Sequence, residues 1–291
     1  MRRIDHVVLA VRDLEQTADL YRRLGFQVGA RNRHPWGTEN RLIQFGSSFI
    51  ELITVGQDPH RIPQRQPRQF SFGEFVRNYL RQQEGIAMLV LSSDDACADA
   101  NLFAHHGIGD FEPFSFSRKA TRPDGSETQV GFTLAFATDP AAPELGFFVC
   151  QQHYPENFWN RVFQQHPNAA VDVSGVTLAA LQPERHRTFL SRFSGTSPRP
   201  LPGGGLLWDL SRSSIEVLPT AAPNPSEWPA MLTTLSVQVP EPERARSILA
   251  AKGFPCTNTA QGVIVPAEAL HGVSLRFTHI QHPGADGSEP D

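Results

Sequence analysis

Two segments near the N-terminus each place a chemically active side chain among apolar neighbours. His6 alternates with valine and alanine in the segment 4–11, and Glu51 alternates with phenylalanine and isoleucine in the segment 49–55. Side chains two apart in a strand point to the same face, so both groups should lie on apolar faces. Because burying a lone carboxylate is costly, Glu51 needs a cation or a hydrogen-bond partner. The pair therefore predicts either a divalent metal site or a His–Glu hydrogen bond without metal.

A metal site at this pair needs a third protein ligand, because two ligands alone would bind an ion loosely. His153 alternates with Val149 and Gln151 at the end of a strand-like segment, which makes it the candidate third ligand. Together with Glu51 it is also the candidate for a catalytic role. The alternative interpretation of His153 is a capping or surface histidine.

The segment 34–40, with the sequence HPWGTEN, is typical of a hairpin between two strands. Its glycine permits a positive φ, and its threonine and asparagine offer hydrogen bonds at the turn. His34, Trp36 and Asn40 are therefore candidates for contacting a substrate from the rim of a pocket. Alternatively, these residues only hold the loop.

A second group of candidates for substrate binding lies in the middle of the chain. Arg118 shares a predicted strand face with Phe114 and Phe116. An arginine beside two aromatic rings can hold a carboxylate while the rings contact an apolar body. The alternative for Arg118 is a salt bridge at the surface.

The elements that would position these residues recur four times, each copy as a strand, a helix and further strands. The four first strands are expected at 4–11, 86–91, 173–179 and 232–239, and in the first copy further strands are expected at 26–30, 40–45 and 49–55. An extra helix is expected at 72–84, and residues 154–171 would connect the two halves. Two copies together supply eight strands, enough to curl around a ligand.

We therefore predict an α+β protein of four βαβββ modules, paired into two cup-shaped, mainly antiparallel domains. The alternative is an α+β protein whose periodicity is coincidental.

Length, charge and cysteine content limit the classes of function. The chain of 291 residues has room for two domains. A net charge of −4 without long runs of one sign argues against nucleic acid or an anionic membrane as a partner. The 3 cysteines suit a reducing cytoplasm. We expect a cytoplasmic protein whose partner is a small-molecule substrate, with a homodimer left open.

The first half resembles the glyoxalase-like branch of the vicinal oxygen chelate superfamily, which includes glyoxalases, bleomycin-resistance proteins and extradiol dioxygenases. The resemblance depends on IDHVVLAV at 4–11, HPWGTENRL at 34–42 and FIEL at 49–52, in that order, and on HGV at 271–273. It implies paired βαβββ modules and a divalent metal ion, such as zinc, nickel, manganese or iron, held by His6 and Glu51.

The sequence departs from that pattern where the second module should repeat a ligand. Ala87 or Met88 occupies the matching place in its first strand, and Val149 or Cys150 the place in its fourth strand. In the second half, Glu216 echoes Glu51 without a matching histidine. We therefore expect a glyoxalase-like domain with the ligand site at 1–155, a degenerate second domain at 172–280, and a disordered tail at 281–291.

Two functions are compatible with these features. The first is a metal-dependent lyase, isomerase or dioxygenase that acts on a small substrate with vicinal oxygens. The second is a metal-free protein of the same fold that binds or sequesters a small molecule. Bound metal in the purified protein would distinguish them.

Overall fold

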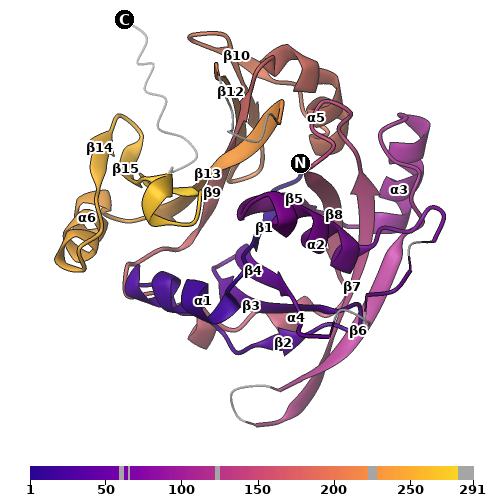
Figure 1. Cartoon of the computed structure of the whole chain (residues 1–291), viewed down its shortest axis with the longest axis horizontal. Coiled ribbons are helices and arrows are strands. Elements are labelled where there is room, and N and C mark those ends of the chain that lie inside the picture. The colour runs from indigo at the N-terminus through magenta and orange to yellow at the C-terminus, as the bar shows by residue number, and fades with distance from the viewer. Residues whose placement is uncertain (59–61, 65, 122–124, 222–227, 281–291) are drawn as a thin grey trace, which may run out of the picture.

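A computed structural model describes residues 1–58, 62–64, 66–121, 125–221 and 228–280 (Figure 1). The expected tail at 281–291 lies outside the described residues. The first module consists of β1 (Ile4–Ala10), α1 (Leu14–Arg23), β2 (Asn32–Arg33), β3 (Thr38–Gln44) and β4 (Phe49–Val55). Helix α2 (Phe72–Gln82) follows it. The second module consists of β5 (Gly85–Ser92), α3 (Ala96–His105), β6 (Phe114–Thr121), β7 (Glu127–Ala137) and β8 (Gly146–Gln152).

The second half repeats this order after a connection that contains the short helices α4 (Pro155–Phe158) and η2 (Arg161–Gln164). Its first module consists of β9 (Asp172–Ala180), η3 (Pro183–His186), α5 (Arg187–Ser194), β10 (Arg199–Leu201), β11 (Gly205–Asp209) and β12 (Ser214–Pro219). Its second consists of β13 (Ala230–Val239), α6 (Pro242–Ala251), β14 (Thr257–Thr259), β15 (Gly262–Val265), η4 (Ala267–Ala269) and β16 (Ser274–His279).

Strand pairing follows one rule in all four modules. The first strand runs parallel to the last, and the last pairs antiparallel with the strand before it. Modules of one half meet through their first strands, β1 with β5 and β9 with β13, both antiparallel. The predicted α+β class is thus confirmed, and the division into domains at 1–155 and 172–280 stays a prediction.

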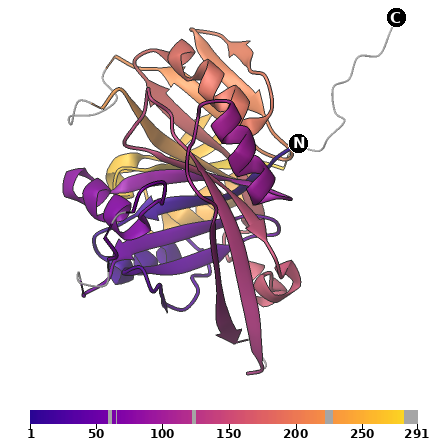
Figure 2. The same cartoon turned by 90° about the vertical axis from the view of Figure 1, so that its right-hand side faces the viewer.

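The two halves are joined by strand pairing and by buried polar contacts. Leu232 of β13 pairs with Ile86 of β5, which makes the strands one continuous 16-stranded sheet. His186 Nδ1 lies 2.6 Å from Asp139 Oδ2, and both side chains are buried. Figure 2 shows the β6–β7 hairpin extending beyond the rest of the sheet.

Local sequence explains the boundaries of the elements near the site. Asp13 accepts hydrogen bonds from the backbone N–H groups of Glu15 and Gln16, which caps α1. Gly25, at φ 87°, ends the helix in the left-handed conformation that glycine adopts without strain. In the described part of the chain, no helix has both the length and the apolarity to span a membrane.

The expected strand at 26–30 is wrong, because this segment joins no ladder and the strand lies later, at β2. Phe26 instead completes the helix end, where its N–H donates to Tyr21 O, and its ring packs against Phe45 and His166. From sequence, an apolar segment directly after a helix end predicts a strand, but here the side chain of Phe26 packs in the core.

The corresponding face of the second half is closed by an internal ion pair. Glu216 of β12 accepts hydrogen bonds from Thr177 and Gln261 and pairs with Arg276 at 3.3 Å. A carboxylate with three partners is satisfied within the protein. Glu216, which occupies in this half the place that Glu51 has in the first, therefore takes part in structural contacts.

Candidate functional site

A bulge in β1 brings two consecutive polar side chains to the same face of the sheet. Ile4 pairs with Leu91 and His6 with Val90, so Asp5 is an extra residue without a partner across the ladder. Bulges re-aim side chains in this way and are common beside active sites. Asp5 Oδ1 lies 2.7 Å from His6 Nδ1, and both residues are buried. A carboxylate there accepts the Nδ1 proton, which leaves Nε2 as the free nitrogen of His6.

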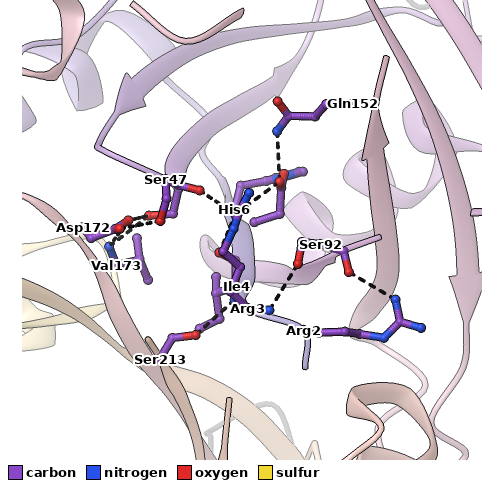
Figure 3. A network of polar contacts seen from close by, with 12 residues as sticks. Arg2, Arg3, Ile4, His6, Ser47, Ser92, Gln152, Asp172, Val173 and Ser213 are labelled. Carbon is purple, nitrogen blue, oxygen red and sulfur yellow. Dashed lines mark hydrogen bonds and ion pairs between the residues drawn. The ribbon is translucent and has the colours of Figure 1, made fainter. Parts of the chain in front are cut away.

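Asp5 is itself held from two directions, by residues that Figure 3 shows around His6, namely Gln152 and Arg3. Gln152 at the end of β8 donates a hydrogen bond of 2.9 Å to its other oxygen, Oδ2. The guanidinium of Arg3 lies 3.6 Å from the same oxygen and donates to the carbonyl of Ser47. The Asp5 carboxylate is therefore fixed before any ligand binds.

Glu51 faces His6 from the neighbouring strand β4. Its Oε2 lies 3.9 Å from His6 Nε2, and its Oε1 accepts a hydrogen bond of 2.5 Å from Asn40 Nδ2. The oxygen of Asn40 accepts from Asn32 Nδ2 at 3.0 Å, which fixes the orientation of the amide. The ring of Phe49 stacks on His6 with centroids 4.2 Å apart. One oxygen of Glu51 is thus occupied, and the other points toward the imidazole.

The hairpin between β2 and β3 places His34 and Trp36 beside this pair. His34 Nδ1 lies 2.8 Å from the hydroxyl of Thr38, and its Nε2 lies 3.4 Å from the amide nitrogen of Asn40. Burial lowers the pKa of His34, while Glu51 raises it and Arg118 lowers it. His34 is therefore neutral at pH 7 and acts through its hydrogen bonds. Trp36 stacks on its ring at 4.6 Å.

These groups open into a pocket of about 580 Å³, including the space continuous with solvent. Most of its wall is aromatic or aliphatic, and it draws on both modules, on α2 and on the connection between the halves. The lining residues are His6, His34, Trp36, Asn40, Leu42, Phe49, Glu51, Ile53, Phe72, Phe116, Arg118, Phe132, Leu134, Phe148, Cys150 and Phe158.

Arg118 of β6 gives the pocket its permanent positive charge. Burial lowers the pKa of its guanidinium, and the charge of Glu51 raises it. The guanidinium forms no hydrogen bond or ion pair with any residue that the structure describes. The surface salt bridge considered for Arg118 is therefore not formed within the described residues. Phe116 lines the pocket as well, whereas Phe114 packs behind it against Trp36 with centroids 5.3 Å apart.

His153 is not brought to His6 and Glu51. His153 and Gln151 lie on the same side of the chain, as alternation predicts. That side of β8 faces away from the pocket, because Gln151 Oε1 accepts a hydrogen bond from the backbone N–H of Ala96 in α3. His153 is exposed, and its Nε2 lies 2.7 Å from the hydroxyl of Thr133. The pocket face of β8 carries Phe148 and Cys150 instead. Alternation sets which residues share a face but leaves open which face is concave.

The donor set does not fit a resident divalent metal. His6 and Glu51 could contribute one atom each, but metal sites in proteins commonly need three or more protein ligands. Met88 and Val90 of β5 pair with β1 opposite Val8 and His6 and supply no hard donor. Burial and the charge of Asp5 raise the pKa of the Cys150 thiol, which keeps it protonated. Within the described residues, no group of three His, Cys, Asp or Glu side chains could hold an ion.

Sequence reasoning gave no site role to Asp5, Cys150 or Phe158. An acidic residue directly before His6 in an apolar strand is an identifiable signal, because a buried carboxylate needs partners. Phe158 comes from α4, in a segment that the sequence presents as a connection. Its carbonyl accepts a hydrogen bond from Gln44, which docks the connection onto the first module.

The chain matches the family model described as a glyoxalase-like domain over residues 4–193. No curated protein matches it significantly in sequence. Among solved structures, a hypothetical protein from Staphylococcus aureus is similar, with a TM-score of 0.68 and 11% identity, over 96% of this chain and 100% of that one. The Mn(II)-bound glyoxalase from Novosphingobium aromaticivorans has a TM-score of 0.58 and 12% identity, over 97% and 84%.

A mutant of 4-hydroxymandelate synthase from Streptomyces coelicolor has a TM-score of 0.60 and 10% identity, over 99% of this chain and 95% of that one. Identities this low show a shared fold alone. The family model, in contrast, covers more than half of the sequence and includes the strands that carry His6 and Glu51. This protein therefore belongs to the glyoxalase-like domain family.

Proposed function

We propose that the protein is an isomerase or lyase that transfers a proton at the carbon beside a carbonyl group, without a resident metal. The observation that carries this proposal is the arrangement Asp5–His6–Glu51. Asp5 holds the proton on Nδ1 of His6, so that Nε2 has a free lone pair facing the pocket, 3.9 Å from a carboxylate oxygen. Oriented carboxylate–histidine pairs act as general bases in enzymes.

The two groups divide the work of one proton transfer. His6 Nε2 takes the proton from carbon, and the electron pair of the broken C–H bond moves onto the carbonyl oxygen as an enolate. Glu51 Oε2 stabilises the imidazolium that forms, and His6 returns the proton to the same carbon. In the isomerisation of a hydroxy ketone, His6 returns it to the former carbonyl carbon, while the hydroxyl proton of the neighbouring carbon moves to the enolate oxygen. The apolar wall excludes water, which strengthens these interactions. No oxidant or further reactant is needed.

The metal-dependent alternative has support from the similarity to a Mn(II)-bound glyoxalase and opposition from the incomplete donor set. The binding or sequestration alternative requires an apolar pocket but makes no use of the Asp5–His6 pair.

Deuterium exchange tests the proposal without knowledge of the natural substrate. EDTA-treated protein is incubated in D₂O with hydroxyacetone, dihydroxyacetone and 2-hydroxyacetophenone, and proton NMR follows deuterium incorporation beside the carbonyl. We expect incorporation by the native protein that falls by about 10²-fold or more in His6→Asn and Glu51→Gln. His153→Asn and Glu216→Gln are the matched controls and should keep the activity, since neither residue lines the pocket.

Two outcomes would overturn the proposal. One is deuterium exchange that disappears when EDTA is added and returns with Mn²⁺, which would favour the metal-dependent activity. The other is incorporation by the native protein no greater than by His6→Asn, which would favour a binding protein.

A further inference from the structure

The pocket combines one unpaired cationic group with a wall of aromatic rings. Arg118 is the permanently charged cation among its described lining residues, and it interacts with Glu51 electrostatically without forming an ion pair. A partly buried guanidinium without a partner is costly, because its N–H groups lose water and gain no acceptor. Its place in the wall of the pocket points to an acceptor that arrives with the ligand.

The chemistry of that acceptor follows from the number and kind of donors. Guanidinium binds a planar carboxylate through two parallel hydrogen bonds. A phosphate carries more charge and is usually held by several cations or by backbone N–H groups at a helix N-terminus. With one arginine and a carboxylate, Glu51, in the same wall, the pocket suits a single negative charge.

The ligand's body is defined by the rings around the pocket. The ring centroid of Phe132 lies 5.5 Å from that of Phe158 in an edge-to-face contact and 5.2 Å from that of Phe116 in a tilted contact. The centroids of Phe49 and Phe158 are 5.2 Å apart. Trp36 meets Phe116 at 5.0 Å in a T-shaped contact. Rings that already pack on one another at different tilts offer both faces and edges to a further ring. A polyhydroxylated ligand would leave most of its hydroxyls against phenylalanine without partners.

The indole of Trp36 supplies a second unused donor beside the same pocket. Its Nε1 is buried and has no acceptor in the part of the chain that the structure describes. Buried indole N–H groups usually find a partner.

We propose that the pocket binds a small aromatic monocarboxylate, with its carboxylate on Arg118 and its ring among Phe116, Phe132 and Phe158. This assignment rests on the proposed function only for the statement that the ligand is a substrate; the binding itself depends on Arg118 and the rings. It explains why a site with proton-transfer groups also has a cation that takes no part in their hydrogen bonds.

Calorimetric titration with three probes tests the assignment. Phenylacetate has both ring and charge, phenylacetamide keeps the shape without the charge, and acetate keeps the charge without the ring. We expect phenylacetate to bind the native protein at least about tenfold more tightly than either analogue, because charge-assisted hydrogen bonds and ring burial both contribute. Quenching of tryptophan fluorescence by phenylacetate should give the same affinity.

Variants at two neighbouring positions of β6 test whether Arg118 provides the charge that binds the carboxylate. Arg118→Gln should weaken phenylacetate about tenfold or more and should bind phenylacetate and phenylacetamide alike. Lys119→Gln removes the same charge from the next position, where the side chain is exposed and pairs with Glu127. This matched control should leave the affinity unchanged. Phe132→Leu should weaken phenylacetate and leave the preference over the amide intact.

The assignment would be overturned by equal binding of phenylacetate and phenylacetamide to the native protein, by an Arg118→Gln variant with unchanged affinity, or by no binding of phenylacetate at 10 mM, a concentration about tenfold above a weak Kd of ~1 mM.

Failure of the ligand assignment can be distinguished from failure of the proposed function. If His6→Asn and Glu51→Gln bind phenylacetate normally but native protein shows no exchange chemistry, the ligand class stands and the enzyme proposal fails. If exchange occurs on neutral carbonyl compounds and Arg118 has no influence, the enzyme proposal stands and the ligand class fails.

Discussion

The chemistry of the site depends on how single side chains are held. His6 takes its orientation from Asp5, which is in turn held by Gln152 and lies close to Arg3. Glu51 takes its orientation from Asn40. Each reactive group thus has one atom committed to a neighbour and one atom free, which is the arrangement that preorganised proton transfer requires.

Asp5→Asn tests the positioning role of Asp5. The asparagine has nearly the same shape, but its amide can turn its NH₂ toward Nδ1 and so favour the opposite tautomer of His6. We expect the exchange rate to fall by roughly 10²–10⁴-fold, with phenylacetate affinity and melting temperature nearly unchanged. Nitrogen-15 NMR of the imidazole should show the proton on Nδ1 in the native protein and moved to Nε2 in the variant. A rate loss with an unchanged tautomer would contradict the role given to Asp5.

At the scale of elements, the pocket is closed by helix α2 packing on the β2–β3 hairpin. The contact is close because residue 73 is glycine. A Cβ built there would lie 2.5 Å from the carbonyl oxygen of Trp36 and 2.9 Å from Ile62 Cγ1. No larger residue fits unless the helix moves away from the hairpin that carries His34 and Trp36.

Gly73→Ala tests this packing. Alanine raises helix propensity by up to about 1 kcal/mol, but the clash with backbone should outweigh this gain. We expect a net loss of about 1–3 kcal/mol in the free energy of unfolding and weaker phenylacetate binding, measured by urea titration and calorimetry. Asn78→Ala, on the exposed side of the same helix, is the control and should not lower stability or affinity. A stabilised Gly73→Ala variant would show that α2 is not held against the hairpin.

At the scale of the whole molecule, the connection between the halves is docked onto the first module by His166. Its Nδ1 accepts from the backbone N–H of Gln27, and its Nε2–H donates to the carbonyl of Gln44. Burial lowers the pKa of His166, while the hydrogen bond to Gln44 raises it to a smaller extent. Protonation at Nδ1 would break the bond from Gln27, so the docked state requires the neutral imidazole.

The stability of the protein should therefore depend on pH through His166. Its pKa in the folded protein lies below its ordinary value of 6.5, so the unfolded chain binds the proton first as pH falls. The stabilisation is complete above pH 6.5 and is lost below it, by up to ~1.4 kcal/mol per pH unit. In urea titrations between pH 7.5 and 5, His166→Asn should lower stability at pH 7.5 and show a shallower decline than the native protein. His105→Asn, at an exposed histidine of α3, should keep the native slope. Equal slopes in all three proteins would exclude this role.

Much of this architecture can be predicted from sequence because the signals are local. Alternation in 4–11 and 49–55, the cap at Asp13 and the stop at Gly25 mark elements that the structure contains. The motifs in 4–52 indicate the family that the domain match shows, and the structure places four of their residues, His6, Glu51, His34 and Asn40, in one pocket. Periodicity and caps act within a few residues, so they can be read without knowing the rest of the fold.

What tertiary structure alone decided is which faces and loops meet. The parity of His153 is correct, yet its face of β8 packs toward α3, because concavity is a property of the closed sheet and not of one strand. Asp5 joins His6 through a bulge set by pairing with β5, and Phe158 reaches the pocket from a connection. These contacts link segments far apart in the chain, and their geometry depends on how the sheet curves, which no single segment determines.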